Sequence, residues 1–164
     1  MADVARGKAR HTGDATRTAL PGVVDAVKAL AHPGRLRILG MLRGGDLCVC
    51  QLTAVLGLAA STVSSHLSDL RRAGLLAERR DGKWVHYQLV RSGPLADLVR
   101  QTLRLVEEDD RLEQDARVVD DLRRVPLETF CNMGFDRTTV GLVPRLSRPD
   151  TARRRTAPHR VNRR

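Results

Sequence analysis

Two cysteines separated by a single residue, Cys48 and Cys50, are the residues of this sequence best suited to chemistry. Their thiolates are soft ligands, which select soft ions. In a regular helix, side chains two residues apart point in nearly opposite directions, whereas in an extended segment they lie on the same side. One ion therefore binds both thiolates only if the chain departs from a regular helix here, and a ligand at this position would pull on the element that follows.

The length and composition indicate one small, mainly helical domain with additional tails. The chain has 164 residues, of which only 2% are aromatic, and Leu, Val and Ala supply most of its apolar content, which favours helices over a sheet sandwich. Residues 1–20 do not resemble a signal peptide, and no apolar run approaches the length of a membrane span. We therefore expect a cytoplasmic protein without a membrane partner. In that reducing compartment its three cysteines are expected to be thiols, ligands or redox groups rather than a disulfide framework.

The net charge of +10 is concentrated at the two ends of the chain. Residues 1–20 carry four basic and two acidic side chains, and residues 144–164 carry eight arginines and one aspartate, so the middle of the chain is close to neutral. We expect a disordered basic arm at 1–20 and a disordered arginine-rich tail at 144–164. The tail either holds phosphates loosely and without sequence preference or is simply solvated.

Apolar periodicity predicts four helices in the first half of the chain. The first runs from Pro21 to about His32, and the second begins at Pro33 and ends before Gly44. The third covers about 49–56 and is closed by Gly57. The fourth is expected to begin with Ser61 as its N-cap and to end near Arg72.

After the fourth helix, the period of the sequence changes from that of a helix to that of strands. Residues 75–80 and 84–89 are compatible with strands, and Asp81-Gly82 between them is a strong hairpin signal. Trp84 and Tyr87 are most simply residues that pack within this hairpin.

A single long helix is predicted from Pro94 to Arg124, with an acidic patch at 107–110 that faces water. A helix of about 30 residues is roughly 45 Å long, which is more than a small domain covers. Part of its apolar stripe is therefore expected to meet a second subunit. The stripe consists of Leu98, Leu105, Leu112 and Val119, at heptad intervals.

This order of elements describes a winged helix-turn-helix. The fourth helix turns Val63, Leu67 and Leu70 inward and presents polar side chains able to meet base edges or phosphates. Basic side chains cluster at the hairpin turn, where a wing meets backbone phosphates or the minor groove. The alternative is that these side chains are merely solvated. The predicted DNA-contacting residues are Ser61, Thr62, Ser64, Ser65, His66, Arg71, Arg79, Arg80 and Lys83.

Three segments, 30–39, 46–52 and 61–76, resemble the ArsR/SmtB family of metal-sensing transcriptional repressors. That resemblance implies a homodimer, paired through its first and last helices, that binds palindromic double-stranded operator DNA and releases it when a toxic ion arrives. His66 is expected to be a packed or hydrogen-bonded residue of the fourth helix rather than a metal ligand. The winged helix-turn-helix and dimerisation domain is predicted at 21–124, and neither the arm nor the chain after it belongs to the family pattern.

The run Leu47-Cys48-Val49-Cys50 is similar to the branch of this family that responds to arsenic, antimony, cadmium or lead. The resemblance implies arsenite, As(III), or Sb(III) as the inducer, with Cd(II) or Pb(II) as alternatives. Capture of the ion would unwind the start of the third helix and tilt the recognition helix. The zinc-sensing branch places aspartate and histidine ligands on the last helix, and residues 94–124 contain no histidine.

The third cysteine, Cys131, is the candidate for a third metal ligand. The arsenic-responsive pattern often places another cysteine three residues after the second, where this chain has Thr53. Trivalent arsenic bonds three sulfurs in a pyramid, and Val125-Pro126 would let a docking segment at 125–143 bring Cys131 back to the site. Alternatively, Cys131 is a small buried apolar residue of that segment.

Three other hypotheses remain open at this point. The same fold could sense thiol oxidation or persulfides. A cysteine-dependent reductase is the enzymatic alternative, but the sequence has no C-x-x-C pair, Walker loop, dinucleotide fingerprint or zinc-protease helix. We therefore predict that the protein is not an enzyme. A general nucleic-acid binder driven by the tail would lose binding on removal of residues 144–164.

Overall fold

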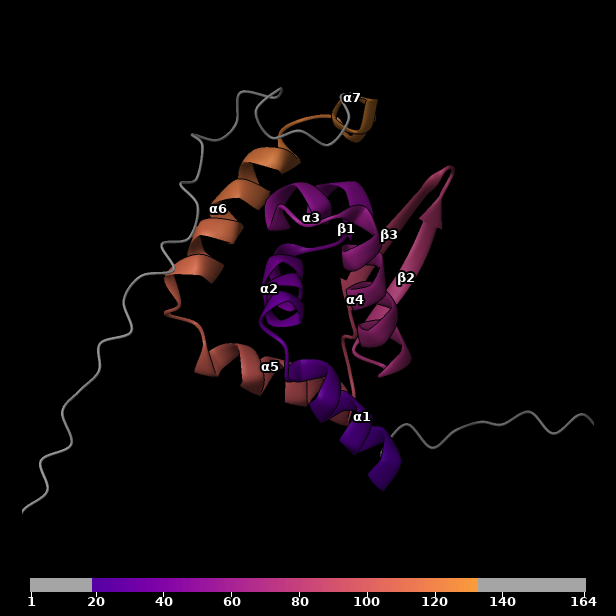
Figure 1. Ribbon diagram of the computed structural model, residues 1–164, viewed down its shortest axis with the longest axis vertical. Coiled ribbons are helices and arrows are strands. Elements are labelled where there is room, and N and C mark those ends of the chain that lie inside the picture. The colour runs from indigo at the N-terminus through magenta and orange to yellow at the C-terminus, as the bar shows by residue number, and fades with distance from the viewer. Residues whose placement is uncertain (1–18, 133–164) are drawn as a thin grey trace, which may run out of the picture.

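A computed structural model of the chain describes residues 19–132, which form a mainly helical winged helix-turn-helix, as predicted (Figure 1). Most of the predicted N-terminal arm, positions 133–143 of the docking segment and the arginine-rich tail lie outside the described residues. In chain order, the elements are α1 (Leu20–Leu30), α2 (Pro33–Met41), the 3-10 turn η1 (Leu42–Gly44), β1 (Leu47–Cys48), α3 (Val49–Leu56), α4 (Ala60–Arg72), β2 (Leu76–Asp81), β3 (Trp84–Leu89), α5 (Pro94–Leu105), α6 (Asp110–Arg123) and α7 (Leu127–Asn132).

Helix α2 lies in the middle of the domain, where it packs against α1, α3, α4, α5 and α6 (Figure 1). Its start is determined locally, because Pro33 suits a first helical turn and the Nδ1 atom of His32 accepts a hydrogen bond from the backbone N–H of Gly34 at 3.1 Å. Ile38 and Leu39 on α2 are fully buried. The inward stripe predicted for α4 is confirmed, since Val63, Leu67 and Leu70 are each 0% exposed.

The recognition helix α4 begins two residues earlier than predicted. Its N-cap is Ala59, in an extended conformation, and no side chain caps the helix there. The prediction that Ser61 is the N-cap is therefore wrong, and Ser61 lies in the exposed first turn instead. The preceding helix α3 ends as predicted, with Gly57 in the left-handed conformation at φ 65°, which glycine adopts without a steric penalty.

The wing hairpin pairs Leu76 with Leu89 at one end and Asp81 with Trp84 at the other. The connecting residues are thus Gly82 and Lys83, one position later than the predicted turn. A third strand, β1, lies on the other side of β3, so the order in the sheet is β1-β3-β2. Sequence reasoning missed β1 because a two-residue strand is too short to show a period of two.

The prediction of one long helix from Pro94 to Arg124 is wrong. Helix α5 ends at Leu105, and α6 begins at Asp110. The carboxylate of Asp109 accepts hydrogen bonds from the backbone N–H groups of Arg111 and Leu112, at 3.0 and 3.1 Å. An N-cap of this kind starts a new helix. The break also disperses the predicted heptad stripe, since Val119 is 3% exposed whereas Leu105 is 86% exposed.

Helix α6 is fastened to α2 by a buried ion pair. The guanidinium of Arg37 meets the carboxylate of Asp115 through two hydrogen bonds, Nε to Oδ2 at 2.6 Å and Nη2 to Oδ1 at 2.8 Å. Only 7% of the Asp115 side chain is exposed. Only three residues separate the end of α6 from the start of α7, so the ion pair contributes to the position of α7.

None of the helices within residues 19–132 combines the length and the apolar character that crossing a membrane would require.

Candidate thiol site and DNA-contacting surface

The sulfur atoms of Cys48, Cys50 and Cys131 lie at one point of the structure. All three are within 4.8 Å of one another, and the Sγ atom of Cys50 lies at bonding distance from the Sγ atoms of both other cysteines. A sulfur atom forms only one disulfide, so these side chains are best described together as a three-sulfur cluster. Cys48 and Cys50 are 2% and 6% exposed, and Cys131 is half-buried.

Cys48 and Cys50 meet because helix α3 begins between them. Cys48 ends β1 and is the N-cap of α3, with an extended backbone at φ −85° and ψ 164°, while Cys50 lies in the first helical turn. The sequence predicted that one ion could reach both thiolates only if the chain departs from a regular helix at this point. It does so, because Cys48 is extended and the helix begins after it, and this change from strand to helix brings the two sulfurs together.

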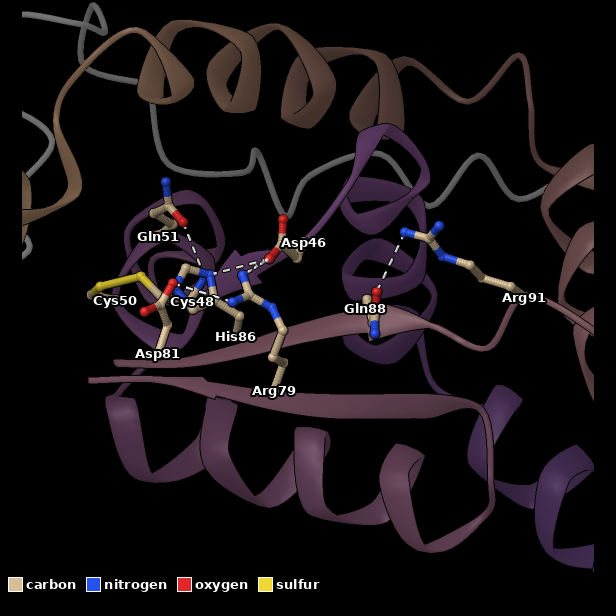
Figure 2. Close-up of polar contacts among 9 residues, drawn as sticks. All are labelled: Asp46, Cys48, Cys50, Gln51, Arg79, Asp81, His86, Gln88 and Arg91. Atoms are coloured by element: carbon tan, nitrogen blue, oxygen red, sulfur yellow. Dashed lines mark hydrogen bonds and ion pairs between the residues drawn. A yellow bond between two sulfur atoms is a disulfide. The ribbon is translucent and has the colours of Figure 1, made fainter. Parts of the chain in front are cut away.

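Gln51 holds Cys48 in place through a reciprocal cap (Figure 2). The side-chain Oε1 atom of Gln51 accepts a hydrogen bond from the backbone N–H of Cys48 at 3.0 Å, and the Cys48 sulfur accepts one from the backbone N–H of Gln51. This is the capping-box arrangement with cysteine in the usual place of serine or threonine. The spacing, a glutamine three residues after the cap, was a signal in the sequence that our reasoning missed.

Cys131 reaches the cluster from α7, which lies in the predicted docking segment. Its neighbour Phe130 is 1% exposed and belongs to the hydrophobic core. Phe130 thus fills the core and anchors α7. The alternative assignment of Cys131, as a small buried apolar residue, is a poorer fit because its sulfur points to the other two thiols.

Asp46 connects the start of β1 with the wing (Figure 2). Its carboxylate lies 2.9 Å from Nη2 of Arg79 and 3.5 Å from Nδ1 of His86. The hydrogen bond from Arg79 holds the pKa of the Asp46 carboxyl below its usual value, against the opposing effect of burial. Arg79 also meets Asp81 at 3.2 Å. Neither Asp46 nor His86 was among the predicted site residues.

The predicted DNA-contacting residues differ in how available they are. Arg79 is occupied by two carboxylates, Arg71 lies 3.6 Å from Glu78, and Lys83 lies 3.5 Å from Glu128. Arg80 is exposed and forms no ion pair with any residue of the described segment. The four polar residues of the recognition helix are all exposed, and they are Ser61, Thr62, Ser64 and Ser65.

His66 does not belong to that exposed surface. It is 9% exposed, and its ring lies 4.5 Å from the ring of His32, centroid to centroid. Burial lowers the pKa of His66, and the nearby His32 and Arg35 add to the shift, while Asp69 opposes it. The structure therefore removes His66 from the predicted DNA-contacting set and places it as a packed residue between α4 and the start of α2.

Comparison with known proteins finds one matching family. Its profile, described as "Bacterial regulatory protein, arsR family", matches residues 32–78. The arsenic resistance transcriptional regulator ArsR1 of Pseudomonas putida is 49% identical over 63 residues, which cover 38% of this chain and 49% of that protein. The arsenical resistance operon repressor of Escherichia coli is 45% identical over 67 residues, covering 40% of this chain and 57% of that protein. The chain thus spans about half the length of these two curated relatives.

A third relative is covered more completely. An HTH-type transcriptional regulator of Methanocaldococcus jannaschii is 37% identical over 82 residues, which cover 49% of this chain and 86% of that protein. The part of this chain that the family profile matches runs from the start of α2 into β2 and includes the recognition helix α4.

Proposed function

The chain belongs to the arsR family of bacterial regulatory proteins, and from this premise we propose that it is a transcriptional repressor that releases operator DNA when Cys48, Cys50 and Cys131 bind a thiophilic ion. The observation that supports this proposal best is the convergence of three sulfurs from two distant parts of the chain. The family consists of regulatory proteins rather than enzymes, which agrees with the lack of enzyme motifs in the sequence.

The donor set fits a soft ion that takes three ligands. The three sulfurs lie within 4.8 Å of one another, as they must if one ion is to touch all of them, and soft thiolates prefer soft ions. Trivalent arsenic or antimony is the inducer we propose, and Cd(II) or Pb(II) is the alternative for the same sulfurs. A sensor of thiol oxidation or persulfides is the second candidate function, since thiols that lie within 4.8 Å of one another could also be oxidised together.

The proposed partners are operator DNA and a second copy of the chain. The exposed polar face of α4 suits a major groove, and the wing suits the adjacent backbone. Apolar side chains of α1 and α5 remain uncovered, which favours a symmetric dimer formed through these helices. The cytoplasm is the location that we propose for it. These side chains are Leu20 (77% exposed), Val23 (39%), Val24 (40%), Val27 (52%) and Leu105 (86%).

Serine substitution at the cluster tests the function directly. In Cys48→Ser or Cys50→Ser, we expect operator affinity to stay within about twofold of wild type, whereas release by arsenite, about 5–150-fold in the wild type, is abolished. The measurement is fluorescence anisotropy on a duplex selected from random sequences, with and without arsenite. Cys131→Ser is expected to reduce the thiolates bound per arsenic from three to two, read from the thiolate-to-arsenic absorption band.

Thr53→Ala is the matched control for these substitutions. It changes a partly buried residue of the same helix without removing a thiol, so it should release DNA as the wild type does. Loss of DNA binding by the serine variants before any arsenite is added would contradict the proposal.

Arg80 carries the expected contribution of the wing to DNA binding. Arg80→Ala should weaken binding to all duplexes alike and reduce the slope of log K against log salt by about 0.9 for each phosphate that Arg80 neutralises. The physical reason is that a lysine or arginine on a phosphate releases condensed counterions. The slope is measured by titrations at several salt concentrations, and Arg111→Ala, an exposed arginine on α6, should leave it unchanged. An unaltered slope in Arg80→Ala places Arg80 outside the interface.

A further inference from the structure

The three-sulfur cluster is attached to the wing at Cys48. β1 pairs with β3, with Leu47 opposite Tyr87 and Cys48 opposite His86. Directly before β1, Asp46 bonds to both strands of the hairpin, to Arg79 on β2 and to His86 on β3 (Figure 2). The segment that supplies Cys48 is therefore joined to the wing by strand pairing and by two side-chain interactions.

A second attachment joins the cluster to the tip of the wing. Helix α7 supplies Cys131, and Glu128, three residues earlier on the same helix, lies 3.5 Å from Nζ of Lys83 in the hairpin turn. In Figure 1, α7 lies at the same end of the molecule as the tip of the hairpin. Cys131 and Glu128 lie on one short helix. If α7 moves when Cys131 binds an ion, Glu128 moves with it.

The recognition helix is held differently. The Asp69 carboxylate of α4 lies 3.5 Å from Nη1 of Arg35 on α2, and the ring of His66 lies against that of His32. Neither interaction involves a segment that carries a cysteine. The elements that supply Cys48 and Cys131 are thus fastened by polar interactions to the wing. Helix α4 has these polar interactions with α2 and one exposed ion pair with the wing, from Arg71 to Glu78 at 3.6 Å, and a pair so exposed holds α4 to the wing only weakly.

We propose that the wing is the element that the cluster moves, with Asp46 and Glu128 as the two clasps that transmit the movement. This inference rests on the proposed function. One ion bound by Cys48 and Cys131 fixes the distance between β1 and α7, which are clasped to the wing near its middle and at its tip. A change in that distance acts at two separated points of one hairpin and turns it. The protein then no longer fits the DNA, because the wing has turned, whereas α4 keeps its position against α2.

Trp84 offers a direct measurement of the wing, because it is the single tryptophan of the chain and the first residue of β3. The full chain without DNA is titrated with arsenite, and the thiolate absorption band and the tryptophan emission are recorded together. In the wild type, both signals should change with the same number of equivalents. In the double variant Asp46→Asn, Glu128→Gln the absorption band should remain, whereas the emission change should fall at least about threefold and arsenite should shift DNA affinity less than about twofold.

The matched control is Glu108→Gln, Asp120→Asn. It also removes two exposed carboxylates, neither of which forms an ion pair with the residues that the structure describes. It should behave as the wild type in both signals.

The possible failures are distinguishable. An absorption band without an emission change in the wild type, or an undiminished emission change in the clasp variant, overturns the inference and leaves α4 as the moving element. Absence of the absorption band in the wild type overturns the proposed function itself.

Discussion

Asp115→Ala is expected to lower the free energy of unfolding by about 3–5 kcal/mol, because it leaves the Arg37 guanidinium buried without its partner. The carboxylate and guanidinium side chains are only 7% and 16% exposed, and two short hydrogen bonds join them. Burial makes the loss of one partner expensive, since the remaining charge can recover little hydration. The measurement is urea unfolding of the full chain, followed by far-ultraviolet circular dichroism.

Two variants separate the buried pair from ordinary surface charge. Glu113→Ala lies on the same helix and removes an exposed partner of Arg117, with 60% of the Glu113 side chain exposed, so its effect should be below about 0.5 kcal/mol. The double variant Arg37→Met, Asp115→Leu replaces both charges by apolar groups and should recover most of the loss. Equal effects of Asp115→Ala and Glu113→Ala would show that the pair does not hold α6 to α2.

Phe130→Ala is expected to detach α7 and free Cys131 from the cluster. Phe130 is 1% exposed and is the largest fully buried side chain among the described residues, and truncating a buried phenylalanine costs about 3–5 kcal/mol. If about 3 kcal/mol of this holds α7 in place, local opening becomes roughly a hundredfold more frequent. The trapping rate of Cys131 by a thiol reagent in the reduced protein should rise accordingly, measured by mass spectrometry of the labelled peptide.

Thr129→Ala is the control for that prediction, because Thr129 is exposed on the same short helix. In Thr129→Ala, the thiol reagent should label Cys131 at the wild-type rate. If it also labels Cys131 of Phe130→Ala at that rate, Phe130 is not the anchor of α7.

Local patterns predicted most of the elements correctly. Helix α3 begins and ends where glycine, periodicity and length placed it, and β3 has the predicted bounds. These signals act over a few residues, so no distant interaction was needed to interpret them. Two of the failures, Ser61 as a cap and the unbroken helix from Pro94, have a common cause. Several nearby residues could cap a helix, and which backbone N–H groups need a partner depends on where packing lets the helix begin.

The sequence by itself determined which chemical groups this protein has, above all its three thiols. Its pattern also predicted a polar helix followed by a basic hairpin, which is the order typical of a DNA-binding regulator. The sequence also marked Cys131 as a candidate partner for Cys48 and Cys50, but spacing along the chain says nothing about separation in space for residues about eighty positions apart. Packing decided that question, because burial of Phe130 and the Arg37 to Asp115 ion pair fold the end of the chain back over α3. The clasps at Asp46 and Glu128 have no local signal at all, since each joins surface residues that become neighbours only after the sheet and α7 have formed.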